Sequence, residues 1–175
     1  MTNISAAFDL GLKRTGIAWR GDSDVFVCPP PLHRSPMDDI RISARLNWWM
    51  ECFEMALLPH AGSPVAVEGP FIHPKHINGA MRLVELHGAF RVAAHRAGCP
   101  VTLVSPSELK QWATGRGNAG KAEMVQRAVE LGCGSNDDNE ADAFLLFAML
   151  SGHTTERVVL EGTDEFNRGF RGVRS

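Results

Sequence analysis

The sequence predicts an α/β fold: a mixed five-stranded sheet, three antiparallel strands followed by two parallel ones, flanked by helices. Three short apolar or β-branched segments follow one another near the N-terminus with no room for a helix between them, which indicates antiparallel pairing. Two further apolar segments, 64–68 and 100–104, each follow a long segment of helical periodicity. Helical crossovers between strands indicate parallel pairing, so strand one and these two segments are expected to lie together at the sheet centre.

The first hairpin places an acidic residue at the end of a strand. We predict a buried strand over 4–8, a tight glycine-containing connection over 10–14 and a return strand over 15–19. Asp9 lies where the first strand ends, and taken alone it could equally bond its own turn or serve a site. A third strand is predicted over 24–27, because the prolines that follow it cannot donate to a ladder.

Helical patterns account for most of the remaining chain. The first helix is expected to begin at Ser35-Pro36 and to run to about residue 58, with Ile40, Ala44, Trp48, Cys52 and Met55 recurring at helical spacing. Further helices are predicted over 77–97, 106–113, 121–131 and from the acidic run at 137–140 onward. The apolar arc of helix 77–97 is wider than one sheet contact needs, so this helix is either fully internal or offers a partner surface.

Composition favours one domain, which we expect over residues 1–152. Residues 153–175 are expected to form a C-terminal extension, partly mobile, with a short strand at 158–160. No apolar run approaches the length of a membrane span and no export signal is evident, so a cytoplasmic protein is expected. The four cysteines lack C-x-x-C spacing, which indicates buried, reduced thiols rather than disulfides or a zinc knuckle.

The overall charge is not typical of a nucleic-acid-binding protein. The formal net charge is -2 and the pI is about 6.4, whereas nucleic-acid-binding domains are usually basic. The charge is uneven, however, because Lys110, Arg116, Lys121 and Arg127 share one segment in which only Glu123 opposes them. Local positive patches can coexist with an acidic centre.

Two carboxylates are expected to meet at one edge of the sheet. Asp9 and Glu68 both end strands that should be neighbours, about 4.8 Å apart at the backbone. Left alone, the two would repel each other, so a cation between or beside them makes physical sense. Their hard oxygen ligands favour Mg²⁺ or Mn²⁺ over zinc.

The last helix offers further oxygen ligands. Asp138 and Asp142 are four residues apart and share a helical face, on which Asn139 also lies. The acidic residues at 137–140 could simply be favoured by the dipole at a helix N-terminus. Asp142, in contrast, interrupts an apolar face where an unpaired charge is costly. Three or four such ligands could hold two ions, roughly 3.5–4 Å apart, the clamp used for in-line phosphodiester hydrolysis.

Four segments in order carry a resemblance to a known family. They are FDLGLKRTGIAW, VAVEGPF with the helix AMRLVELHGAFRVAAHRAG, SPSELKQWATGRGNAGKAEMVQRAV, and DDNEADAFLLF. Together they resemble the RuvC-type Holliday junction resolvases of the ribonuclease H-like (retroviral integrase) superfamily, over about residues 4–150. A DLG motif alone also occurs in actin-like ATPases, but this chain is short for two such lobes and lacks a second phosphate-binding glycine loop.

The resemblance implies a set of site residues. Asp9, Glu68 and Asp142 match the metal-binding carboxylates of the family. The fourth ligand is usually three residues before the last aspartate, which is Asn139 in this chain. We expect Asp138 instead, because a carboxylate binds Mg²⁺ better than an amide oxygen and helix phase can shift by one residue in a frayed first turn.

The resemblance also implies contacts with DNA. Phe71 matches an aromatic residue used against bases near the crossover, although it could equally anchor its loop on the core. Lys121 and Lys110 match basic positions near the catalytic centre, where they would stabilise negative charge, and solvated helix lysines are the alternative. His73 and His76 have no further zinc ligands, so contact with phosphates is expected from their loop. The expected DNA-binding residues are Phe71, Lys75, His76, Lys110, Arg116 and Lys121.

The function implied is that of a crossover junction endodeoxyribonuclease. We expect it to use two Mg²⁺ ions, with Mn²⁺ substituting, and to resolve four-way junctions as a homodimer through two symmetrical nicks. A ribonuclease H-fold enzyme acting on flaps or RNA·DNA hybrids is one alternative, since fold does not fix substrate. A catalytically inactive junction-binding protein is another, in view of Asn139 and the modest charge.

Overall fold

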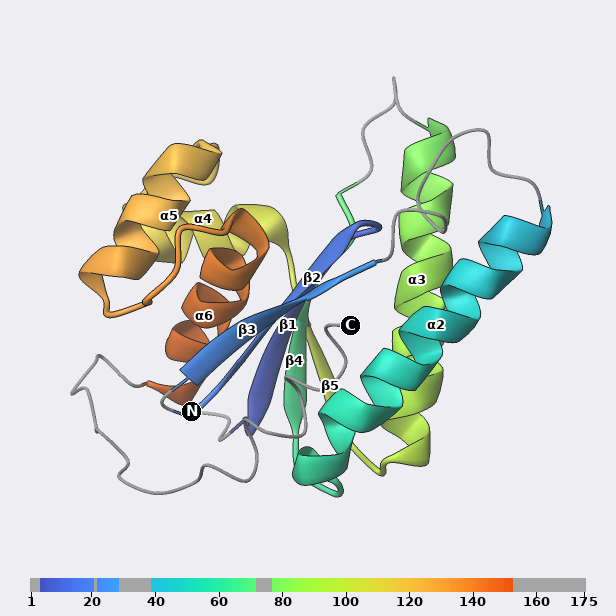
Figure 1. Cartoon of the computed structure of the whole chain (residues 1–175). Helices are drawn as coiled ribbons and strands as arrows, with labels where there is room; N and C mark the ends of the chain where they lie inside the picture. Colours follow the sequence, from blue (N-terminus) through green and yellow to red (C-terminus); the bar gives the residue numbers. More distant parts are fainter. Residues whose placement is uncertain (1–3, 21, 29–38, 72–76, 153–175) are drawn as a thin grey trace.

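The computed structural model describes residues 4–20, 22–28, 39–71 and 77–152 (Figure 1). The strands are β1 (Ala6–Leu10), β2 (Arg14–Trp19), β3 (Asp22–Val27), β4 (Val65–Glu68) and β5 (Val101–Val104). The helices are α2 (Asp39–Leu57), the 3₁₀ turn η1 (Leu58–His60), α3 (Ile77–Arg96), α4 (Pro106–Thr114), α5 (Lys121–Glu130) and α6 (Asp138–Ser151). Each predicted element whose residues are described is present.

The five strands form one mixed sheet in the order β3-β2-β1-β4-β5. β1 pairs antiparallel with β2, and β2 pairs antiparallel with β3, while the β1–β4 and β4–β5 pairs are parallel. The predicted fold class is therefore confirmed. One detail of the prediction is wrong: β5 lies at the edge of the sheet and not at its centre.

Helices cover both faces of the sheet (Figure 1). α2 and α3 cover one face, and α4, α5 and α6 cover the other. Alternate residues of each strand point to opposite faces, so Phe8 and Val67 join the core under α2 and α3, while Ala7 and Ala66 join the core under α6. The first core contains an aromatic cluster in which the ring centroids of Phe8 and Phe90 lie 4.8 Å apart.

The side of α2 that the sequence pattern predicts to be buried is not the side that is buried in the structure. Ile40 and Met55 are exposed, and Trp49 is fully buried where Trp48 was expected. The pattern misleads because the buried face includes a charged residue, Arg45, which an apolar count omits. The residues buried along α2 are Ile42, Arg45, Trp49, Cys52, Phe53, Ala56 and Leu57.

The sheet face under α6 is built from small residues. Ala7 of β1, Ala18 of β2 and Ala66 of β4 are fully buried there, and Gly16 lies on the same face of β2 as Ala18. Small side chains allow a helix to approach the strands closely. This close approach brings the first turns of α6 to the carboxyl ends of β1 and β4.

Several predictions concern other parts of the chain. The four cysteines are free and buried, as predicted. Among the described residues, no helix has the length and apolar character needed to cross a membrane. The strand expected at 158–160 and the whole C-terminal extension lie outside the described residues.

Candidate active site

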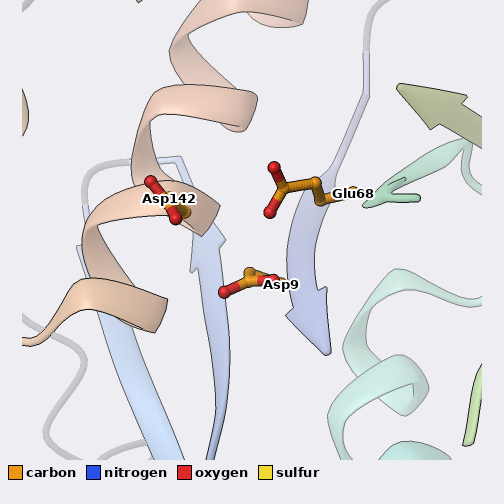
Figure 2. A group of neighbouring side chains, drawn as sticks. All are labelled: Asp9, Glu68 and Asp142. Atoms are coloured by element: carbon orange, nitrogen blue, oxygen red, sulfur yellow. The ribbon is translucent and has the colours of Figure 1, made fainter. Parts of the chain in front are cut away.

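Two strands and one helix bring three carboxyl groups together at one edge of the sheet (Figure 2). Phe8 of β1 pairs with Val67 of β4. The next residues, Asp9 near the end of β1 and Glu68 at the end of β4, therefore lie side by side on the same face of the sheet. Asp142 of α6 points toward both. One oxygen atom from each carboxyl group lies within 4.8 Å of the others. The expected meeting of Asp9 and Glu68 is therefore present in the structure.

Gly16 allows α6 to reach this position. It lies directly opposite Asp9 in the β1–β2 ladder. A Cβ atom built on Gly16 would lie 1.9 Å from the backbone oxygen of Asn139 and 2.8 Å from the backbone nitrogen of Glu140. No real side chain fits at that distance, so the first turn of α6 rests on the backbone of β2 where only glycine leaves room.

Burial makes the ionised forms of these carboxyl groups costly. Burial and the charges of Asp9 and Asp142 raise the pKa of Glu68 to about 10. Burial also raises the pKa of Asp142 to about 7 and that of Asp9 to about 6. A protonated Glu68 at neutral pH can donate its hydroxyl hydrogen to Asp9, which relieves the repulsion between the two groups.

The same cluster suits a divalent cation. Within the described part of the chain, the Oδ1 atom of Asp142 is buried and has no hydrogen-bond partner. An unpaired buried carboxylate oxygen is costly unless something positive binds it. Three hard oxygen donors within 4.8 Å of one another fit Mg²⁺ or Mn²⁺, which would also overcome the raised pKa values by replacing protons.

Four consecutive residues tie the start of α6 to four different elements. Asp137 caps the helix and forms an ion pair with Arg14 of β2, with 2.6 Å between Nη1 and Oδ2. The other contacts are those of Asp138 with Lys121 of α5, of Asn139 Nδ2 with Asp9 Oδ2 at 2.8 Å, and of Glu140 with Ser23 of β3 at 2.7 Å. These contacts fix both the rotation and the height of α6, and thereby the position of Asp142.

The two candidates for a fourth ligand have different partners. Asp138 is bound to Lys121, whose hydrogen bond lowers the pKa of the Asp138 carboxyl. Asn139 donates directly to Asp9. Asn139 is thus the candidate whose side chain contacts the carboxylate cluster, and the expectation that Asp138 supplies the fourth ligand stays a prediction.

Two lysines lie near the cluster, as expected. The positive charge of Lys110 opposes the burial that raises the pKa of Glu68 and Asp142, and Lys121 does the same for Asp9 and Asp142. Arg116 is engaged differently, since its Nη2 atom lies 2.7 Å from both carboxylate oxygens of Glu123. The two lysines therefore influence the cluster electrostatically, whereas Arg116 is held in a surface ion pair.

Phe71 follows β4 by three residues and is 67% exposed. The expectation that Phe71 contacts DNA bases stays a prediction. The other loop residues singled out in the sequence, His73, Lys75 and His76, lie outside the described residues.

Two features of the site were missed from sequence. Gly16 carried a signal, because an isolated glycine inside a strand indicates a close backbone approach. The contact between Asn139 and Asp9 had no signal in the sequence. Neighbouring residues of a helix differ by about 100° in direction, and the sequence does not determine the rotation of the first turn of α6.

The sequence matches one protein family over most of its length. The model of the family described as crossover junction endodeoxyribonuclease RuvC matches residues 9–149. The relative of that name from Rhodococcus jostii is 33% identical over 144 residues, which cover 79% of this chain and 75% of the relative. The relative of the same name from Anaeromyxobacter sp. is 41% identical over 109 residues, covering 62% of this chain and 58% of the relative.

Solved structures share the fold. The chain in "T. thermophilus RuvC in complex with Holliday junction substrate" superposes with a TM-score of 0.61 at 23% identity, covering 85% of this chain and 96% of that one. The yeast mitochondrial Holliday junction resolvase Ydc2 gives a TM-score of 0.57 at 14% identity, covering 86% and 80%. At these identities the likeness concerns the fold, which is that of the junction resolvases.

Proposed function

The chain belongs to the RuvC family of crossover junction endodeoxyribonucleases, and on this premise we propose that it cuts four-way DNA junctions with a carboxylate-bound metal. The observation that carries the proposal is the convergence of Asp9, Glu68 and Asp142 within 4.8 Å from three separate elements. Carboxylates cluster in this way at the expense of stability, so the arrangement calls for a functional reason.

Asp9, Glu68 and Asp142 would hold divalent ions, two Mg²⁺ ions by analogy with other in-line phosphodiester hydrolases. When bound, such ions supply a Lewis acid and an activated water for attack on phosphorus. Asn139 or Asp138 would complete the ligand set. The hard oxygen chemistry of the donors supports Mg²⁺, with Mn²⁺ as a substitute.

The protein's own residues would position the DNA strand and balance its charge. Water attacks the scissile phosphorus and the bond from phosphorus to the 3′ oxygen breaks, leaving a 5′-phosphate and a 3′-hydroxyl. Lys110 and Lys121 lie near enough to influence the carboxylates, so they can also stabilise the negative charge that grows on the phosphate. Phe71 would stack on a base near the branch point.

A four-way junction needs two symmetrical nicks, and we propose that a two-fold homodimer makes them. α3 supports this part of the proposal. Along one side of that helix Ile77, Met81, Val84 and Val92 are each about half exposed or more. A stripe of exposed apolar residues on a helix is typical of a protein interface.

A panel of substrates tests the proposed function. Four-way junctions, flaps and RNA·DNA hybrids are incubated with Mg²⁺, Mn²⁺ or EDTA, and the nicks are mapped on sequencing gels. We expect symmetrical nicks in four-way junctions with Mg²⁺ and none with EDTA. Preferential cutting of hybrids or flaps would favour the alternative nuclease, and binding without cutting under every metal condition would favour an inactive junction-binding protein.

A further inference from the structure

Arg14, at the start of β2, is linked to the carboxylate cluster through the cap of α6. Its Nη1 atom lies 2.6 Å from Oδ2 of Asp137. The other oxygen of that carboxylate, Oδ1, accepts hydrogen bonds from the backbone nitrogens of Asn139, at 3.1 Å, and Glu140, at 3.3 Å. Asn139 in turn donates through Nδ2 to Asp9 at 2.8 Å. A continuous chain of contacts therefore runs from β2, through the helix cap, to a carboxylate of the cluster.

Two residues of β2 face the first turn of α6. Arg14 and Gly16 point to the same face of the sheet, because strand residues two apart share a direction. Gly16 determines how closely the helix can approach, since only its missing side chain leaves room for the backbone of Asn139. That room permits the approach without holding the helix in place. Arg14 supplies the attraction, because its ion pair holds Asp137, the cap of the helix, against the start of the strand.

This ion pair is less exposed than others in the described part of the chain. The Asp137 side chain is 10% exposed, whereas the acidic side chains of five other ion pairs are 35–50% exposed. Opposite charges attract more strongly and are screened less by salt where water is excluded, and exposed pairs contribute little. The pair of Arg14 and Asp137 is therefore better able than those five to hold two elements in one position.

A direct contact with DNA is the alternative role for Arg14. Its side chain is 48% exposed and lines an open cavity that Asn139 also lines. The guanidinium is already paired, however, so a phosphate would have to displace Asp137 and disturb the helix cap. Lys13, the neighbouring residue, is exposed and offers a positive charge to the same cavity without that cost.

We propose that Arg14 is a positioning residue of the reaction: through Asp137 it holds the first turn of α6 and thereby keeps Asp142 in the carboxylate cluster. The inference rests on the proposed function, because it concerns the same cluster. Asp142 lies on the helix just beyond this first turn, so a tilt or rotation of the turn moves its carboxylate relative to the two strand residues. Because Arg14 acts through the helix, loss of its charge weakens metal binding and slows nicking while leaving junction binding unchanged.

Four variants and one matched control test the pair. Arg14→Gln removes the positive charge, and Asp137→Asn removes the negative charge while keeping a side chain that caps helices as well as aspartate does. The double variant carries both changes, and Arg14→Lys restores the positive charge. Arg96→Gln is the control, since it breaks a 2.7 Å ion pair with Glu54 between α3 and α2, on the opposite face of the sheet from α6 (Figure 1). Thermal melts and native mass measurements confirm that all five fold and assemble like the parent.

Three quantities are measured: Mn²⁺ affinity without DNA by isothermal titration calorimetry, junction affinity in EDTA, and the rate of the first nick with Mg²⁺ at saturating protein. We expect Arg14→Gln and Asp137→Asn each to weaken Mn²⁺ binding and to slow nicking by about tenfold, as residues that support metal ligands do. The double variant should match the single variants, because both changes remove one contact. Arg14→Lys should recover most of both losses. Arg96→Gln should match the parent, and junction affinity should be the same for all.

A DNA contact by Arg14 would give a different pattern, in which Arg14→Gln weakens junction binding and leaves Mn²⁺ affinity at the parental value. That pattern overturns the inference. Losses that multiply in the double variant also overturn it, since the two residues would then act independently, and so do variants that match the parent in every measurement.

The metal titration separates this inference from the proposed function, because it uses no DNA. If the parent binds Mn²⁺ but cuts no junction, the proposed function fails and the Mn²⁺ affinities of the variants still decide the inference. A parent protein that binds no Mn²⁺ would overturn both.

Discussion

Glu68 shows how the site opposes the stability of the fold. Its carboxyl is buried beside two others, which raises its pKa to about 10 from the ordinary glutamate value of 4.5. Between these two pH values the folded state holds a proton that the unfolded state has lost. The contribution of Glu68 to folding stability is therefore most favourable below about pH 4.5 and becomes less favourable as the pH rises toward 10. Asp9 and Asp142 lower the stability further as the pH rises, up to about pH 6 for Asp9 and about pH 7 for Asp142.

We predict that Glu68→Gln removes the largest part of this pH dependence. Glutamine does not titrate, so in EDTA the variant should melt above the parent protein at pH 9 by several degrees and close to it at pH 4.5, since 1 kcal/mol shifts the melting temperature of a chain this size by roughly 2–4 °C. Differential scanning calorimetry from pH 4.5 to pH 9 measures the difference. Glu130→Gln, on the exposed face of α5, is the control. A difference that stays constant across the range would contradict the prediction.

Gly16 is predicted to position the carboxylates without touching them. In Gly16→Ala the new Cβ overlaps the backbone of Asn139, so the first turn of α6 must move and carry Asp142 away from Asp9 and Glu68. Crowding of this kind costs about 1–3 kcal/mol of stability. The affinity for Mn²⁺, measured by isothermal titration calorimetry, should fall at least about tenfold.

Gly88→Ala is the matched control for that variant, because nothing lies within 4 Å of its added Cβ. It should bind Mn²⁺ like the parent protein. Unchanged Mn²⁺ affinity in a folded Gly16→Ala protein would show that Gly16 does not set the geometry of the cluster.

The three cluster residues could be predicted from sequence, because each places a charge where an apolar run ends or is interrupted. Asp9 follows AAF, Glu68 follows VAV, and Asp142 stands within an apolar helix face. The partners of Asp138 and Asn139 could not be predicted in the same way. A rotation of one residue decides which side chain faces Asp9, and only the packing of the helix on β2 fixes that rotation.

At the scale of the element, the first turn of α6 decides which residue completes the metal site. Asn139 contacts Asp9, while Asp138 is paired with Lys121. We predict that Asn139→Asp raises Mn²⁺ affinity, because an added carboxylate would stand beside Asp9. Asp138→Asn should change the affinity by less than about threefold and should instead free Lys121. Metal titration of both variants at one pH measures the two effects.

The opposite result would support the expectation drawn from sequence. If Asp138→Asn weakens Mn²⁺ binding at least tenfold and Asn139→Asp leaves it unchanged, Asp138 supplies the fourth ligand. In that case Asp138 must exchange its contact with Lys121 for the metal.

Elements were predictable where one periodicity dominates. The strands and the helices α3 to α6 lie within about two residues of their predicted positions, because turn residues and caps mark their ends. The face of α2 was predicted wrongly, because it is apolar on more than one side and carries the buried Arg45 on its inner side. Only the packing against β1 and α3 decides which apolar side is buried.

At the scale of the whole molecule, the exposed stripe on α3 bears on assembly. We predict that Val84→Glu converts a dimer into monomers, because a charge in an apolar interface is costly. Val129→Glu on α5 is the control, since Val84 and Val129 are both 47% exposed. Sedimentation velocity measures the two masses. A Val84→Glu protein that keeps the mass of the parent would place the interface elsewhere.

Catalysis is assigned to the carboxylate cluster, and Asp142 tests this assignment most directly because its buried Oδ1 atom has no hydrogen-bond partner in the described part of the protein. The most direct measurement is the rate of the first nick in a synthetic four-way junction with Mg²⁺, for the parent protein, Asp142→Asn and the control Glu130→Gln. We expect Asp142→Asn to bind the junction like the parent and to nick it more than about 100-fold more slowly, since even supporting residues of metal sites cost about 10- to 100-fold. Glu130→Gln should nick at the parental rate. An Asp142→Asn protein that nicks within threefold of the parent would contradict the account.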